Sequence, residues 1–123
     1  MITKFPKLSH TELKPWFDQK ELVAECVLQT RKDLAGYGIN LHFSGDPMNA
    51  YQELFEQLQP QIESFLSRGS TWMEILYRVD VSELKVREAA EQNEVFSASL
   101  TRLILWRELQ KVVTRFLISR QPS

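Results

Sequence analysis

The sequence is poor in the residues that build metal sites and cross-links. It contains one cysteine, Cys26, and two histidines, His10 and His42, among 123 residues. A single cysteine cannot form an intramolecular disulfide and cannot by itself make a cysteine-based zinc site. Neither histidine has a second histidine or cysteine at ligand spacing. We therefore expect no metal and no cofactor.

Long apolar runs are also missing. The longest uninterrupted one, Leu103–Trp106, is far shorter than the roughly 20 residues that cross a bilayer. The segment Met1–His10 has no apolar stretch of the kind found in secretory signals. We therefore expect a cytoplasmic protein that does not enter a membrane. Its composition, 43% hydrophobic and 25% charged, is typical of one globular unit, so residues 1–123 are predicted to form a single helical domain.

Helical spacing of apolar residues is the main signal in the chain. In residues 46–66 the apolar positions share one face, and Pro60 lies on the opposite face. This pattern predicts one amphipathic helix, capped by Asp46 and bent at Pro60 with the ring toward water. Similar patterns predict a first helix that begins between residues 9 and 14 and a last helix over 97–119.

Two segments alternate apolar and polar residues, as strands do. Residues 37–43 are predicted to be extended, whereas 75–81 follow a capping pair, Thr71 and Glu74, that favours a helix over 71–79. A further helix is expected over 82–92. The predicted fold is therefore all-α, a compact bundle of four to five helices with an extended segment near 37–45. The alternative is an α+β fold with a small sheet made from 37–43 and 75–81.

Residues 71–92 read as helix, short turn, helix, the arrangement of one DNA-binding motif. Asp80 stands where that turn usually has glycine, and Leu76 stands where a small residue lets the helices approach. The second helix also carries more glutamates than cations, which repels phosphate. We do not expect a nucleic-acid partner, and we keep this weak helix-turn-helix interpretation only as an alternative.

Charge is unevenly distributed along the chain. Residues 46–96 carry a net charge of −6 and residues 97–123 a net charge of +4. Within the basic end, Arg107, Lys111 and Arg115 recur every four residues and predict a stripe along one helix face. The stripe either neutralises the acidic middle of the chain or binds an acidic protein partner, or phosphate in the nucleic-acid alternative.

Three further cations fall on predicted apolar faces: Lys20, Arg31 and Arg102. A cation that faces a core must extend to water, pair with an acid or bind an anion. If these three converge on a cavity, they form an anion or small-molecule site with His42 at its rim. If they meet acidic side chains, they form ion pairs instead.

Some apolar residues lie outside the main helix stripes. In the first helix they are Leu22 and Cys26, and in the last helix they are Leu100, Leu103 and Ile104. Surplus apolar surface of this kind is typical of subunit interfaces, so we expect a homodimer. The sequence contains no recognisable catalytic grouping. The leading hypothesis is therefore a non-enzymatic protein-interaction or regulatory module that acts as a homo-oligomer.

Overall fold

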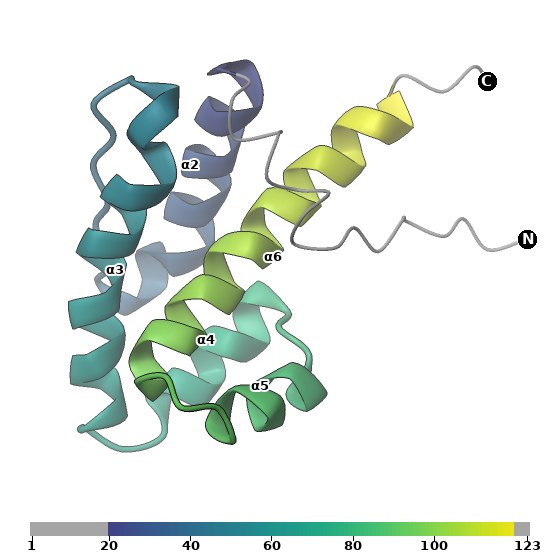
Figure 1. The fold of residues 1–123 in the computed structure, drawn as a ribbon. Helices are drawn as coiled ribbons and strands as arrows, with labels where there is room; N and C mark the ends of the chain where they lie inside the picture. The colour runs from purple at the N-terminus through teal and green to yellow at the C-terminus, as the bar shows by residue number, and fades with distance from the viewer. Residues whose placement is uncertain (1–19, 120–123) are drawn as a thin grey trace, which may run out of the picture.

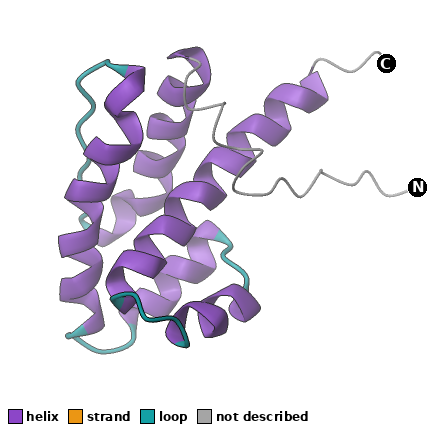
Figure 2. Cartoon of the chain, viewed as in Figure 1, coloured by secondary structure: helices purple, strands orange, loops and turns teal. Residues whose placement is uncertain are grey.

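The computed structural model describes residues 20–119, which form an all-α bundle (Figure 1). Its α-helices are α2 (Lys20–Leu34), α3 (Ala50–Leu66), α4 (Thr71–Val79), α5 (Glu83–Ala90) and α6 (Phe96–Ser119), and two short 3-10 helices are η2 (Ala35–Tyr37) and η3 (Pro47–Asn49). No strand occurs in residues 20–119 (Figure 2). The all-α prediction is confirmed, including a helix at 71–79. The expected start of the first helix and the side chain of Lys20 lie outside the described residues.

The longest helix, α6, is the centre of the bundle. It contacts α2, α3, α4 and α5 and runs diagonally through the molecule in Figure 1. A central helix must be apolar on several sides. Twelve of its residues are buried, and they point to different neighbours. This explains why the apolar residues of 97–119 do not fit within one arc.

The core has two adjoining parts. The larger part joins α3 and α4 to the first half of α6, and it contains Leu100 and Ile104, both fully buried. The smaller part joins α2 to the second half of α6, and it contains Leu22 and Cys26. The expectation that these residues leave surplus apolar surface is therefore wrong. They fill contacts within one chain because α6 is covered on several sides.

Helix α3 follows its sequence pattern closely. Asp46 Oδ1 accepts a hydrogen bond of 3.0 Å from the backbone N–H of Met48, and Pro47 occupies the first position of η3. The helix then continues through Pro60, whose ring is exposed. The missing N–H of a proline is tolerated on a solvent-facing side, as predicted.

The segment predicted to be extended at 37–43 begins later than expected, because Tyr37 belongs to η2 and Gly38 caps it. Residues 39–44 are neither helix nor strand, and helix side chains bind their backbone in place of a second strand. Gln57 makes two of these bonds: its Oε1 accepts from the His42 N–H at 2.7 Å, and its Nε2 donates to the His42 carbonyl at 2.8 Å. Arg31 donates to the Leu41 carbonyl, and Glu53 accepts from the Ser44 N–H. The alternation of apolar and polar residues in this segment corresponds to alternating burial, because Ile39 and Leu41 are buried while their neighbours are exposed.

Within the described part of the chain, no helix is both long enough and apolar enough to cross a bilayer.

Candidate functional site

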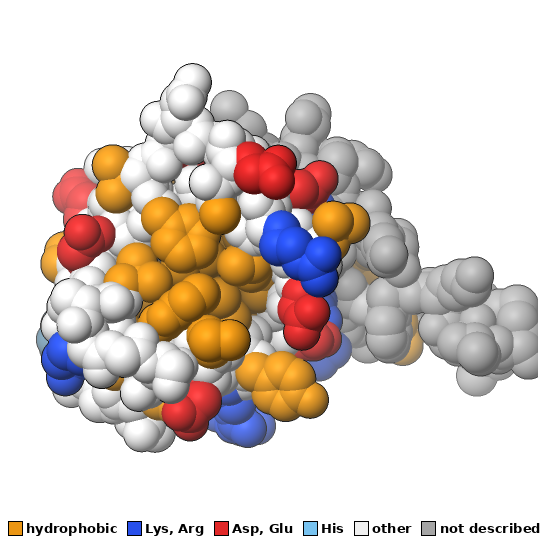
Figure 3. Space-filling view, turned by 90° about the horizontal axis from the view of Figure 1, so that it is seen from below, with side chains coloured by type: hydrophobic (Ala, Val, Ile, Leu, Met, Phe, Trp, Pro, Cys, Tyr) orange, Lys and Arg blue, Asp and Glu red, His pale blue; other side chains and the backbone are white. Residues whose placement is uncertain are grey.

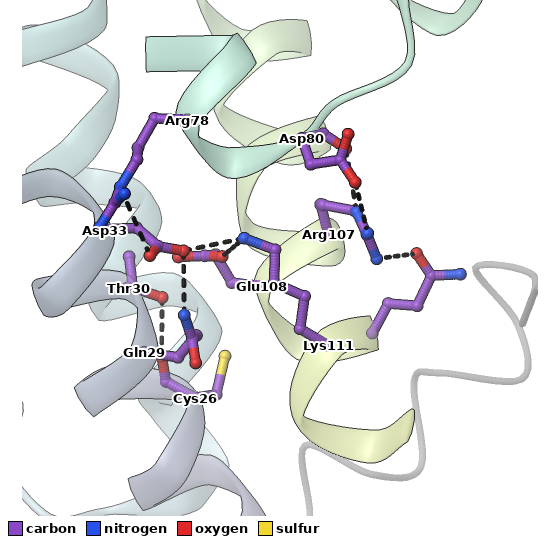
Figure 4. A network of polar contacts seen from close by, with 10 residues as sticks. Cys26, Gln29, Thr30, Asp33, Arg78, Asp80, Arg107, Glu108 and Lys111 are labelled. Carbon is purple, nitrogen blue, oxygen red and sulfur yellow. Dashed lines mark hydrogen bonds and ion pairs between the residues drawn. The ribbon is translucent and has the colours of Figure 1, made fainter. Parts of the chain in front are cut away.

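A buried charge network connects α2 to α6. Lys111 Nζ lies 2.8 Å from Asp33 Oδ2 and 2.9 Å from Glu108 Oε1, and all three side chains are largely buried (Figure 4). Gln29 donates to the same Asp33 oxygen at 3.0 Å, and the Arg78 guanidinium of α4 lies 3.9 Å from the other. The network therefore holds α2 against α6, and Arg78 adds a longer contact from α4.

The two carboxyl groups of this network differ in their protonation. Burial, together with the neighbouring Asp33 carboxyl group, raises the pKa of Glu108 to about 8, although Lys111 acts to lower it. Burial also acts to raise the pKa of Asp33, but hydrogen bonds from Lys111, Glu108 and Gln29 outweigh it and lower that pKa. At neutral pH the proton is on Glu108, and Asp33 is the ionised partner of Lys111.

The raised pKa of Glu108 predicts a pH-dependent stability. The ordinary value is 4.5 and the folded value about 8, so between them the folded state holds a proton that the unfolded state has lost. This contribution to the free energy of unfolding is complete below about pH 4.5 and is lost as the pH rises toward about 8. We expect the stability of the protein to fall over this range, measured by urea unfolding at about pH 5 and about pH 8.

The control for this prediction is Glu108→Gln, which keeps the shape but does not titrate. The variant should gain stability relative to the wild type as the pH rises. Asp33 and Glu94, whose pKa values are lowered, titrate below this range, and the Cys26 thiol titrates above it. Parallel pH dependences in the two proteins would show that Glu108 titrates normally.

The Cys26 thiol lies beside this network but is not reactive. It is fully buried, and burial raises its pKa to about 12, with a further contribution from Glu108. A thiol that stays protonated is a poor nucleophile. Cys26 is therefore a packing residue, as its position in the smaller part of the core indicates.

Arg102 is paired and does not face a ligand cavity. Its guanidinium makes two parallel hydrogen bonds to the Glu94 carboxylate, and Ser99 donates to the same group at 2.7 Å. These bonds, with Arg102 first, lower the pKa of Glu94 to about 2. Because Glu94 belongs to the acidic middle segment, this pair is the ion-pair outcome that the sequence left open.

Arg31 and His42 line one cavity of about 400 Å³, together with residues 39–41 and Ala35. Both residues are exposed, so the expectation that Arg31 faces the core is wrong. Its Nε donates to the Leu41 carbonyl at 2.8 Å, which gives the guanidinium a structural role. Arg102 does not line this cavity, so Arg31 and Arg102 do not meet there, which answers for these two cations a question that the sequence left open.

The predicted basic stripe is largely occupied by internal contacts. Lys111 belongs to the buried network, and Arg107 binds Asp80 through its carboxylate and its carbonyl, each at 2.9 Å. Arg107 therefore neutralises an acid of the middle segment, as one of the two interpretations of the stripe expects, whereas Lys111 pairs with acids outside that segment. Arg115 is the member of the stripe that faces solvent.

Arg107 holds the turn between α4 and α5. Asp80 has a φ of 71°, the left-handed conformation in which glycine is usual. The Val81 N–H donates to the Leu76 carbonyl at 2.9 Å and the Asp80 N–H to the Tyr77 carbonyl at 3.1 Å, which is a Schellman helix end. The helix–turn–helix order at 71–92 is thus present, with Asp80 in place of the glycine. Over α5 and its C-cap residue Glu91, however, three exposed glutamates stand against two exposed cations, Lys85 and Arg87.

A large apolar groove lies between α4 and α5, and we call it the α4–α5 groove. Its volume is about 810 Å³, within the range of small-molecule ligand pockets. Figure 3 views this side of the molecule: hydrophobic side chains fill its middle, with charged side chains of both signs around them. The apolar lining residues are Tyr37, Trp72, Met73, Leu76, Tyr77, Val81 and Val86.

Two of the groove residues project unusually far into solvent. Tyr77 is 88% exposed and Met73 is 57% exposed. They are one helical turn apart on α4 and therefore share one face. A neighbouring helix, α5, exposes Leu84 as well. Exposed large apolar side chains grouped beside a groove mark a contact surface.

Neither the groove nor the buried network was found from the sequence. Met73 and Tyr77 lie beside the apolar face of 71–79 that packs inward, and this second apolar strip was a detectable signal. Glu108 is the only acidic residue in 97–123 and lies between Leu105, Leu109 and Val112 on a buried face. An isolated acid in that position was the signal for a buried, proton-holding carboxyl group.

The residues that line the two cavities include no metal cluster. In residues 20–119 no group of three or more histidine, cysteine, aspartate or glutamate side chains is placed to hold a metal ion. In comparisons with known proteins, no family model, curated protein or solved structure matches this chain.

Proposed function

We propose that this protein is a non-enzymatic protein-interaction or regulatory module, and that the α4–α5 groove is its binding surface. The observation that supports this most directly is the exposure of Tyr77 and Met73 beside an apolar hollow of about 810 Å³. Helix-binding proteins use grooves of this kind to bury the apolar face of a partner segment. We place the module in the cytoplasm, in keeping with its single cysteine.

The shape of the groove supports binding of a protein segment. Its floor is apolar, and its rim carries Glu74 and Arg78 from α4 and Glu83 and Arg87 from α5. Interfaces commonly have an apolar centre and a polar rim. The apolar floor supplies affinity, while the mixed rim charges orient the partner.

The rival interpretations have less support. The exposed glutamates on α5 oppose phosphate binding by the helix–turn–helix segment. The cavity beside Arg31 and His42 is smaller, and the Arg31 guanidinium already donates to a backbone carbonyl. The homodimer expected from the sequence is kept as a proposal, but its surface moves from Leu100, Leu103 and Ile104 to the groove.

Site-specific crosslinking tests this function. Replacing Tyr77 by the photoreactive residue p-benzoylphenylalanine should give a discrete crosslinked protein adduct on irradiation of the native cell. The matched control places the same residue at Met48, which is 82% exposed on η3. Adding Met73→Glu to the position-77 protein should abolish the adduct, because it puts a charge on the groove wall. The absence of an adduct at position 77, or equal adducts at both positions, would overturn the proposal.

A further inference from the structure

The α4–α5 groove and its rim have a symmetry that identifies their partner. Along α4, Met73 and Tyr77 are four residues apart, and so are the oppositely charged Glu74 and Arg78. In an antiparallel pairing of two identical helices about a two-fold axis, the first member of such a pair faces the second member of the other copy. The surface is therefore complementary to itself in both charge and apolar content.

Resting on the proposed function, we propose that the occupant of the groove is a second copy of this chain. The two α4 helices pack antiparallel, with Glu74 of each copy opposite Arg78 of the other. Met73 of each copy contacts the Tyr77 ring of the other, a favourable sulfur–aromatic contact. The two-fold axis passes beside Leu76.

The exposed shape of the groove fits the same arrangement. Tyr77 projects from its lip with 88% of its surface exposed, and the hollow lies directly beside it. A two-fold axis places the projecting ring of each copy in the hollow of the other, against Trp72 and Val86. A buried tyrosine at the centre of an interface, surrounded by a polar rim, is a common source of binding energy.

The rim charges are available for this contact. Arg78 is 53% exposed, and its distance of 3.9 Å from Asp33 leaves it a weak internal partner. On α5, Glu83 and Arg87 are both largely exposed and lie 3.7 Å apart. Each of the two helices thus presents one acidic and one basic side chain at four-residue spacing. In a two-fold pairing, every acidic side chain of one copy can face a basic side chain of the other, so no further partner is needed to balance the charges.

Charge reversal provides the test, with sedimentation equilibrium of the full chain as the measurement. The wild type should form a dimer of about 29 kDa, twice the 14.4 kDa of one chain. Glu74→Arg alone and Arg78→Glu alone each set like charges against each other twice per dimer, so each should weaken the dimer about tenfold or more. The double variant exchanges the two charges and should restore the wild-type affinity.

The mixed experiment is the most specific one. The Glu74→Arg chain is positive at both positions and the Arg78→Glu chain is negative at both, so equal amounts of the two should form a heterodimer more tightly than either self-associates. Glu25→Arg, an exposed change on α2, is the control and should leave the dimer intact. Glu74→Arg keeps the contact between Arg78 and Asp33, so it tests the pairing even if Arg78→Glu folds poorly.

Specific results would overturn the self-pairing. They are a wild-type monomer at high micromolar concentration, a double variant that stays monomeric, or single variants that dimerise as the wild type does. The crosslink at position 77 separates this inference from the proposed function. An adduct at twice the mass of the chain supports both, an adduct with a different protein overturns only the self-pairing, and no adduct overturns both.

Discussion

Lys111→Met is expected to lower the free energy of unfolding by about 3–5 kcal/mol, because it leaves a buried carboxylate without its cation. The methionine fills nearly the same space, so the loss reports the missing charge and its hydrogen bonds. Lys111 is 18% exposed, and its partners Asp33 and Glu108 are 7% and 0% exposed. Urea unfolding followed by circular dichroism at neutral pH measures the effect.

Two further variants separate the charge effect from lost packing. Lys85→Met, on the exposed surface of α5, should change stability by no more than about 0.5 kcal/mol. Combining Lys111→Met with Asp33→Asn removes the stranded charge and should recover a large part of the loss. If Lys111→Met behaves like Lys85→Met, the buried network does not hold α2 against α6.

The second large effect is expected at Ile104, which the sequence placed on a subunit interface and the structure places in the core. Ile104→Ala should cost about 2–5 kcal/mol, since the side chain is fully buried among α3, α4 and α6 and its loss leaves a cavity. Equilibrium unfolding of the variant and the wild type gives the difference.

The comparison for Ile104 is Leu84→Ala. Leu84 is 62% exposed on α5, so the same kind of truncation should change stability by about 0.5 kcal/mol or less. Similar losses in the two variants would contradict the position of Ile104 at the centre of the bundle. A loss confined to Ile104 would confirm that α6 is buried on the side that faces away from its main apolar arc.

The helices of this protein could be predicted because each carries its own local signals. Asp46 and Pro47 mark the start of α3, and the phase of the apolar residues across Pro60 shows that the helix does not break there. The alternation at 37–43 predicted a segment outside the helices, and only its first residue, Tyr37, lies in the 3-10 helix η2 and Gly38 in that helix's cap. Such signals depend on the near neighbours in the chain, which a single sequence displays directly.

The sites could not be predicted because they depend on which faces meet. Arg102 and Glu94 are eight residues apart, and Asp33 and Lys111 are 78 apart. A helical wheel of one segment shows that a cation lies near an apolar face, but it does not show that an acid from another helix is there to receive it. For the same reason Leu100 and Ile104 were mistaken for surface residues. A helical wheel of α6 does not show how many other helices pack around it.

The two hydrogen bonds between Gln57 and the backbone of His42 have a consequence for solubility. An extended segment with free N–H and C=O groups is a template on which another chain can add as a strand, and such templates seed aggregation. The glutamine amide presents one acceptor and one donor, the same pair that a neighbouring strand would offer. The Gln57 side chain thus occupies the place of an intruding strand at His42, and with Arg31 and Glu53 it occupies backbone groups that a second strand would bind.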